Sequence, residues 1–263
     1  EELFEQQTEH FMICLGAGGR TGGAGAEGLI KLVRNYAQLL RLPKPAKRVG
    51  VLMTLPSASE ARSKQAASSA YTAANELIRL AENGQITPLI LIDNEKIKPL
   101  CPDLPVKEYQ PAINRLVADL FDTFNTLSAS PTPYTSFDSM DYLDVLTAGG
   151  CTVMGVTEVK KPRDKHAVST AIRKNLETSL LAGNYKLGKA KTAAGIVLGG
   201  KKMMAQVPGL QDNINYALDV LTAVTGRAVV HRGIYEDDVQ KLRVYTIISG
   251  LPAPIRRIEK LHK

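Results

Sequence analysis

The chain has 263 residues, of which 44% are hydrophobic and 5% aromatic, with no tryptophan. This length suits one large domain or two modest ones, with a core built mainly from aliphatic side chains. No long apolar run is present, which argues against a membrane-spanning helix. The acidic start Glu1-Glu2-Leu3-Phe4-Glu5 is unlike a signal peptide, so we expect a cytoplasmic protein. The net charge of +7 permits an acidic partner without identifying one.

The cysteines give no sign of a disulfide framework or a zinc site. Cys14, Cys101 and Cys151 are an odd number of isolated residues without CxxC spacing. The four histidines are equally scattered along the chain. We interpret both residue types as structural rather than metal-binding.

The first half alternates strands with helices. Short apolar runs predict strands at 11–15, 49–53 and 89–92. A first helix, ended by Pro43 and Pro45, is predicted from apolar residues at helical spacing, which are Leu29, Leu32, Val33, Tyr36 and Leu40. A second, alanine-rich helix is expected from the N-cap Ser59 to about Leu80. This alternation predicts a parallel, doubly wound α/β sheet.

The second half has a different rhythm. A long helix is predicted over about 106–127, and the Ser/Pro-rich segment 128–133 is a break where we place a domain boundary. Beyond it the pattern predicts helices and strands in the order helix 140–146, strand 152–157, helix 165–181, strand 193–198, helix 210–224, and strands 228–233 and 242–249. This order suits a mixed sheet packed on helices.

The strongest local signal is the glycine-rich segment from Gly16 to Gly25, between a predicted strand and a helix. Glycines let the backbone approach a ligand closely, and free N–H groups at a helix N-terminus favour a phosphate. A flexible connection is the structural alternative. The segment lacks the Gly-Lys-Ser/Thr ending of a P-loop, and Thr21 stands where a GxGxxG dinucleotide fingerprint needs glycine. A nicotinamide-dependent enzyme is therefore the poorer interpretation.

Residues 18–24 resemble the phosphate loop of the tubulin/FtsZ superfamily, GGGTG followed by Thr/Ser-Gly. Gly18, Gly19, Thr21 and Gly22 match this pattern, whereas Arg20 replaces a glycine and 23–24 replace Thr/Ser-Gly. The resemblance implies that this loop, together with Gly16, binds phosphates. Arg20 would either reach the γ-phosphate or crowd it.

Further positions follow in the order of the family. Glu60 resembles the glutamate that contacts the ribose, and Lys64 stands where FtsZ usually has arginine. Asn94, in the segment 92–95, resembles the strand-end asparagine that reads guanine. Tyr109 matches the aromatic residue that stacks on the base. Asn114 would be a second guanine reader, although it follows Tyr109 by five residues where the family has four.

After the long helix, the pattern Ser139-x-Asp141-x-x-Asp144 resembles the FtsZ pattern Asn-x-Asp-x-x-Asp. In the family this loop enters the nucleotide pocket of the next subunit, where the acids position the attacking water. The resemblance therefore implies that Asp141 and Asp144 are catalytic. Carboxylates can orient water near a metal-bound triphosphate. The structural alternative is an acidic helix N-terminus favoured by the helix dipole.

The resemblance covers nearly the whole chain, including the strand segments 195–200 and 242–250. It implies a partial GTP-binding domain over 1–105 with a parallel doubly wound nucleotide-binding sheet, a central helix over 106–130, and a smaller α+β mixed-sheet activation domain over 131–263. It also implies GTP/GDP and Mg²⁺ as cofactors, self-association into filaments, and GTPase activity at the subunit interface.

Two departures from the family leave alternatives open. Family members carry a glycine-rich loop and two further phosphate-contacting loops ahead of the segment that this chain matches, so a non-catalytic or truncated relative with a structural or partner-binding role is the alternative. If the chain is a fragment that lacks the first strands of the sheet, an apolar sheet edge is exposed.

The basic tail (Arg256, Arg257, Lys260 and Lys263) is a candidate contact for a nucleic acid or an adaptor protein. The sequence does not distinguish cell division from DNA segregation.

Overall fold

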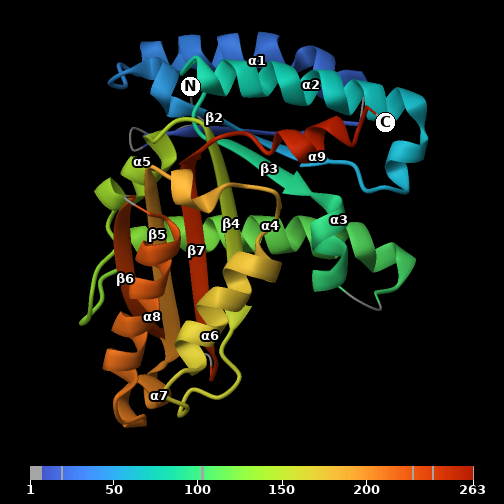
Figure 1. The fold of residues 1–263 in the computed structure, drawn as a ribbon. Helices are drawn as coiled ribbons and strands as arrows, with labels where there is room; N and C mark the ends of the chain where they lie inside the picture. The colour runs from blue at the N-terminus through green and yellow to red at the C-terminus, as the bar shows by residue number, and fades with distance from the viewer. Residues whose placement is uncertain (1–7, 19, 102–103, 227, 239, 263) are drawn as a thin grey trace.

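A computed structural model of the chain describes residues 8–18, 20–101, 104–226, 228–238 and 240–262. Seven strands form one mixed sheet in the order β1-β2-β3-β4-β7-β5-β6 (Figure 1). The strands are β1 Phe11–Gly16, β2 Val49–Leu55, β3 Leu89–Asp93, β4 Cys151–Glu158, β5 Thr192–Gly200, β6 Val229–Asp237 and β7 Leu242–Leu251.

Nine α-helices lie within these described ranges. They are α1 Arg20–Leu39, α2 Lys64–Glu82, α3 Asn94–Ile97, α4 Val106–Ser128, α5 Ser139–Thr147, α6 Ala167–Lys174, α7 Lys201–Gln206, α8 Leu210–Val224 and α9 Ile255–Glu259. None of the described helices is long and apolar enough to span a membrane.

The first four strands are parallel, as the strand–helix alternation predicts. β1 pairs with β2 and β2 with β3 over most of their lengths, whereas β3 joins β4 through only two residue pairs. β7 lies antiparallel between β4 and β5, and β5 and β6 are parallel. The predicted α/β class with a mixed second half is confirmed. All seven strands belong to one sheet, so the sheet marks no boundary between the two predicted domains. The domain limits therefore stay a prediction.

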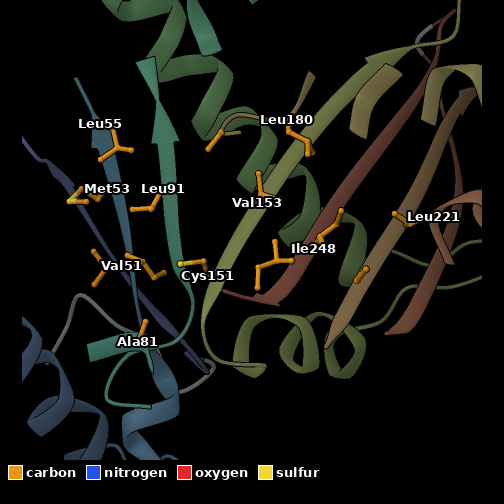
Figure 2. Packing of buried hydrophobic residues seen from close by; sticks show 14 of the residues in the cluster. Val51, Met53, Leu55, Ala81, Leu91, Cys151, Val153, Leu180, Leu221 and Ile248 are labelled. Carbon is orange, nitrogen blue, oxygen red and sulfur yellow. The ribbon is translucent and has the colours of Figure 1, made fainter. Parts of the chain in front are cut away.

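Helices cover both faces of this sheet. α1, α2, α6 and α8 contribute to one apolar cluster, and Figure 2 shows its side chains following β2, β3, β4 and β7. α4 and α5 pack on the opposite face, where Phe124 and Phe137 are completely buried. The core is largely aliphatic, as the composition requires. Burial of apolar area of this kind is the main stabilising contribution to a fold.

The first helix begins earlier than the sequence suggests. α1 starts at Arg20, so most of the glycine-rich segment is helical rather than a loop. The expected buried stripe is also wrong in part, because Leu29 and Leu32 are exposed while Ala26 and Ile30 are buried. Glycine costs roughly 1 kcal/mol in a helix interior, and packing of Ala26 and Ile30 on the sheet offsets that cost.

Two other helix boundaries differ from prediction. Ser63, not Ser59, caps α2 by accepting a hydrogen bond from the backbone N–H of Ala66, because residues 60–62 form a separate 3₁₀ turn. The helix expected over 165–181 is α-helical only to Lys174 and continues as a π-helical turn. The long helix and the helix at 210–224 match their predicted positions closely.

Candidate functional site

Two predicted site residues, 34 positions apart in sequence, meet where the parallel strands end. The side-chain amide of Asn94 donates a 3.2 Å hydrogen bond to Oε2 of Glu60. The same oxygen accepts a 2.6 Å hydrogen bond from the backbone N–H of Ser57. Asn94 immediately follows β3, and Glu60 begins the 3₁₀ turn that follows β2. Carboxyl ends of neighbouring parallel strands share one edge, which is why these residues converge.

These hydrogen bonds fix the state of the carboxylate. Partial burial raises the pKa of Glu60, but hydrogen bonds from the Ser57 backbone, the Ser57 hydroxyl and the Asn94 amide outweigh it, so the pKa lies below its ordinary value. Glu60 is therefore ionised at neutral pH and orients the Asn94 amide. That amide keeps a second N–H and its carbonyl oxygen for a ligand.

Tyr109 lies near the same cluster. Partial burial, followed by the charges of Cys101, Glu60 and Glu95, raises the pKa of its phenol. Glu95 also links the segment after β3 to the segment after β2, because its carboxylate accepts a 2.8 Å hydrogen bond from the backbone N–H of Ala58. The ribose, base-reading and stacking residues that the resemblance implies are thus brought together.

A groove of about 620 Å³ runs between β1, β2 and the long helix α4. Gly16 and Thr54, at the ends of β1 and β2, line it together with Asn114 of α4. Most of its other lining residues are apolar. β1 is an outer strand of the sheet among the described residues. The groove joins the predicted phosphate-loop glycine and the second predicted guanine reader in one hollow.

The remaining phosphate-loop residues are described only in part. Gly18 is exposed and lies close to Ala66 in the first turn of α2. Gly19 lies outside the described residues, and the side chains of Arg20 and Thr21 are not described, although their backbone, like that of Gly22, belongs to α1. Lys64 is exposed at the first position of α2.

The two predicted catalytic acids also lie side by side, in α5. His231 of β6 contacts both of them, with 2.8 Å from Nδ1 to Oδ1 of Asp141 and 3.0 Å from Nε2 to Oδ2 of Asp144. Thr192 donates a hydrogen bond of 3.3 Å to the same Asp144 oxygen. His231 was interpreted from sequence as a bystander; no spacing signal links it to α5, because strand pairing alone brings it there.

A third acid belongs to this group. Asp138 caps α5 by accepting from the backbone N–H groups of Met140 and Asp141, and Asp141 accepts in return from the backbone N–H of Asp138. This reciprocal arrangement is a capping box. Asp138, Asp141 and Asp144 are spaced three residues apart, so the Asp-x-x-Asp spacing occurs in two registers. The repeated spacing was the signal that could have identified Asp138.

The two groups of predicted residues lie at opposite ends of α4. Tyr109 is in the first turn of this 23-residue helix, whereas the acids follow its C-terminus by 10 or more residues. A helix of this length extends about 35 Å. Figure 1 shows α3 near one end of α4 and α5 toward the other. A single chain therefore does not bring its acids to its own Glu60–Asn94 cluster. Within the described ranges, no three His, Cys, Asp or Glu side chains are grouped to hold a metal ion.

The expected role of the basic tail is not supported. The chain folds back after β7, and Arg257 of α9 forms an ion pair with Asp93, with its Nε 2.6 Å and its Nη2 2.9 Å from the two carboxylate oxygens. Their side chains are only 11% and 5% exposed. Arg257 is therefore an internal residue. Arg256 and Lys260 remain exposed, and Lys263 lies outside the described residues.

Comparison with known proteins gives a consistent result. No known family profile matches the chain. It is 26% identical over 168 residues to cell division protein FtsZ 2 of Methanocaldococcus jannaschii, an alignment that covers 63% of this chain and 42% of that protein. The chain thus spans less than half the length of this curated relative.

Solved structures of similar fold cover almost the whole chain. A GDP-form protofilament of TubZ from Bacillus thuringiensis serovar israelensis has a TM-score of 0.78 at 20% identity, with 96% of this chain and 66% of that chain covered. CetZ2 from Haloferax volcanii, in a GTPγS-bound protofilament, has a TM-score of 0.75 at 18% identity and 97% and 70% coverage. An empty FtsZ dimer from M. jannaschii has a TM-score of 0.69 at 19% identity, with 93% and 64% covered. The chain has the fold of the tubulin/FtsZ superfamily, as the glycine loop and the strand-end motifs indicate.

Proposed function

We propose that this chain binds GTP and forms filaments, and that its GTPase site is completed between two copies. The observation that carries the proposal is the separation of the two residue groups at opposite ends of α4. Acids at one end can act on a nucleotide at the other end only if a second copy supplies them. Such a head-to-tail contact is heterologous and generates filaments when it does not close.

The nucleotide end has donor chemistry that fits a guanosine phosphate. Asn94 offers both an N–H and a carbonyl oxygen, the pairing that a guanine edge requires. Glu60 can accept from a ribose hydroxyl, and Tyr109 supplies an aromatic surface beside them. The N-terminus of α1 would offer backbone N–H groups to phosphates. Mg²⁺ would be held mainly by phosphate oxygens and water, as is common for this ion.

The acidic end would supply the groups that act on water. Asp144 is 58% exposed and lies beside Asp141, and Asp138 adds a third carboxylate at the same helix start. Carboxylates placed against the nucleotide of the next copy would orient a water molecule in line with the γ-phosphate. In this proposal GTP turnover depends on assembly. The named relatives that form protofilaments support the assembly step by analogy of fold.

The test is a titration of the purified chain with labelled GTP, with ATP as competitor and light scattering followed in the same sample. The proposal requires saturable GTP binding that ATP does not displace, together with rising scatter. Asn94→Ala should weaken binding, while Asn75→Ala, an exposed change on α2, should not. No binding and no scatter would contradict the proposal.

A second candidate is a non-catalytic relative that binds partners. The contacts of Asp141 within the chain favour this candidate. Its two carboxylate oxygens already contact His231 and the backbone N–H of Asp138. Such a protein would assemble or bind a partner without turnover. GTP-dependent scatter with no phosphate release, in a sample where nucleotide binding is complete, would select this candidate.

A further inference from the structure

Two acidic side chains of α5 are held by one histidine from a distant strand. Nδ1 of His231 lies 2.8 Å from Asp141 and Nε2 lies 3.0 Å from Asp144. The histidine therefore forms a bridge between carboxylates that would otherwise repel each other on adjacent turns of the helix.

The histidine of this bridge is held by its surroundings, whereas the two acids are more exposed to solvent. The His231 side chain is 16% exposed, and its ring packs edge-on against Phe137, whose side chain is completely buried. β6 fixes its backbone, because His231 pairs with Ala194 of β5. Exposure then rises to 29% for Asp141 and 58% for Asp144. The imidazole thus lies behind the acids, which face outward.

The two acids differ in what remains available to a ligand. Asp141 uses one oxygen for His231 and the other for the backbone N–H of Asp138. In Asp144, the hydrogen bonds of His231 and Thr192 converge on the single oxygen Oδ2. The described contacts leave Oδ1 of Asp144 for water. Asp144 is therefore held through Oδ2 alone among the described contacts.

We infer that His231 is a positioning residue, which orients Asp144, and through the shared bridge Asp141, toward the nucleotide of a neighbouring copy. This inference rests on the proposed function and adds a residue that does not touch the substrate. A carboxylate held by a fixed donor needs less reorganisation in the transition state, which is how preorganised groups accelerate reactions. Losing the bridge should therefore lower turnover more than it lowers nucleotide binding or assembly.

Two amide variants separate the two contacts. The side-chain nitrogen of glutamine can take the place of Nε2, and that of asparagine the place of Nδ1. His231→Gln should keep the contact to Asp144 and retain turnover within about threefold of wild type, whereas His231→Asn should keep only the contact to Asp141 and lose about tenfold, as His231→Ala does. GTP binding should be unchanged in all three, since the nucleotide residues lie at the other end of α4, and turnover is compared per assembled chain.

The experiment measures phosphate release per assembled chain, GTP affinity and the unfolding midpoint for wild type and the three variants. Equal turnover in wild type and His231→Ala would overturn the inference. So would losses that follow only the unfolding midpoint, with Gln no better than Asn. In each of those cases wild-type turnover persists, so the proposed function stands. A wild-type chain without GTP turnover would instead end the proposed function, and this inference with it.

Discussion

Arg257 of the C-terminal helix α9 and Asp93 at the end of β3 form an ion pair through two hydrogen bonds, although they lie 164 positions apart in sequence. Nη2 of Arg257 also donates a 2.7 Å hydrogen bond to the carbonyl oxygen of Pro56, so the arginine joins the ends of β2 and β3. Asp93 in turn caps α3 by accepting from the backbone N–H of Glu95. Through Arg257 and Asp93, the C-terminal helix α9 therefore fixes the start of α3, where Asn94 lies.

Breaking this pair should destabilise the chain strongly. Arg257→Ala leaves the nearly buried carboxylate of Asp93 without its partner, and losses of about 3–5 kcal/mol are typical for such changes. Arg257→Lys should recover only part of that stability, because an ammonium cannot bind both carboxylate oxygens as a guanidinium does. Urea unfolding measures the effect, with exposed Arg256→Ala as the matched control. Equal midpoints for Arg257→Ala and Arg256→Ala would show that the pair contributes little.

Asn94→Ala should weaken GTP binding by about tenfold, the usual effect of losing one or two net hydrogen bonds. Glu60→Gln should have a similar but smaller effect, because it removes the charge that orients the Asn94 amide. Calorimetric titration with GTP measures both. An Asn94→Ala chain that binds GTP as tightly as Asn75→Ala would exclude Asn94 from the site.

Bound nucleotide should protect Cys14 from alkylation. This thiol is exposed and lines the groove with Gly16 and Asn114. Partial burial raises its pKa, so the reaction will be slow at neutral pH and faster in mildly alkaline buffer. GTP should slow the labelling of Cys14 severalfold while ATP should not, as mass spectrometry of the alkylated peptides can show. The buried Cys151 is the internal control, and equal labelling of Cys14 with and without GTP would place the nucleotide elsewhere.

His10 should make the fold sensitive to acid. Burial is the main cause that lowers its pKa from 6.5 to about 4, although a hydrogen bond to the carbonyl oxygen of Thr87 opposes the shift. Because the unfolded chain takes up a proton first, stability should fall as the pH drops from 6.5 to 4, by at most about 3.4 kcal/mol. His10→Gln, which keeps a donor for Thr87, should flatten this part of the stability–pH curve. Exposed His166→Gln should leave the slope as in wild type, and an unchanged slope in His10→Gln would contradict the assignment.

Sequence patterns predicted the elements well where apolar periodicity was strong. The helix at 210–224 and the central helix were placed correctly from their sequence pattern alone. The start of α1 was misjudged, since packing of Ala26 and Ile30 holds glycines in a helix that local propensity disfavours. The tail was misjudged for a similar reason. Only the folded chain brings Arg257 to Asp93, so the sequence alone predicted that the basic tail contacts an acidic partner.

The candidate site divides in the same way. The family resemblance placed Glu60, Asn94 and Tyr109 in one region, and the shared edge of adjacent parallel strands explains why Glu60 and Asn94 meet. Motifs in the sequence do not identify the residues that hold the functional groups in place. His231 reaches α5 through the pairing of β5 with β6, and Asp138 is distinguished only by its capping geometry. Whether the predicted residues bind nucleotide and act on it stays a prediction.

The most direct measurement is a mixing experiment between two defective chains. One carries Asn94→Ala at the nucleotide end, and the other carries Asp141→Asn with Asp144→Asn at the acidic end. In a random head-to-tail assembly of equal amounts, about one junction in four joins an intact nucleotide end to an intact acidic end. At a GTP concentration below the wild-type Kd, the account predicts that each chain alone hydrolyses at most about a tenth as much GTP as wild type and that the mixture recovers about a quarter of wild-type turnover. A mixture no more active than the sum of its separate components would contradict a site shared between copies.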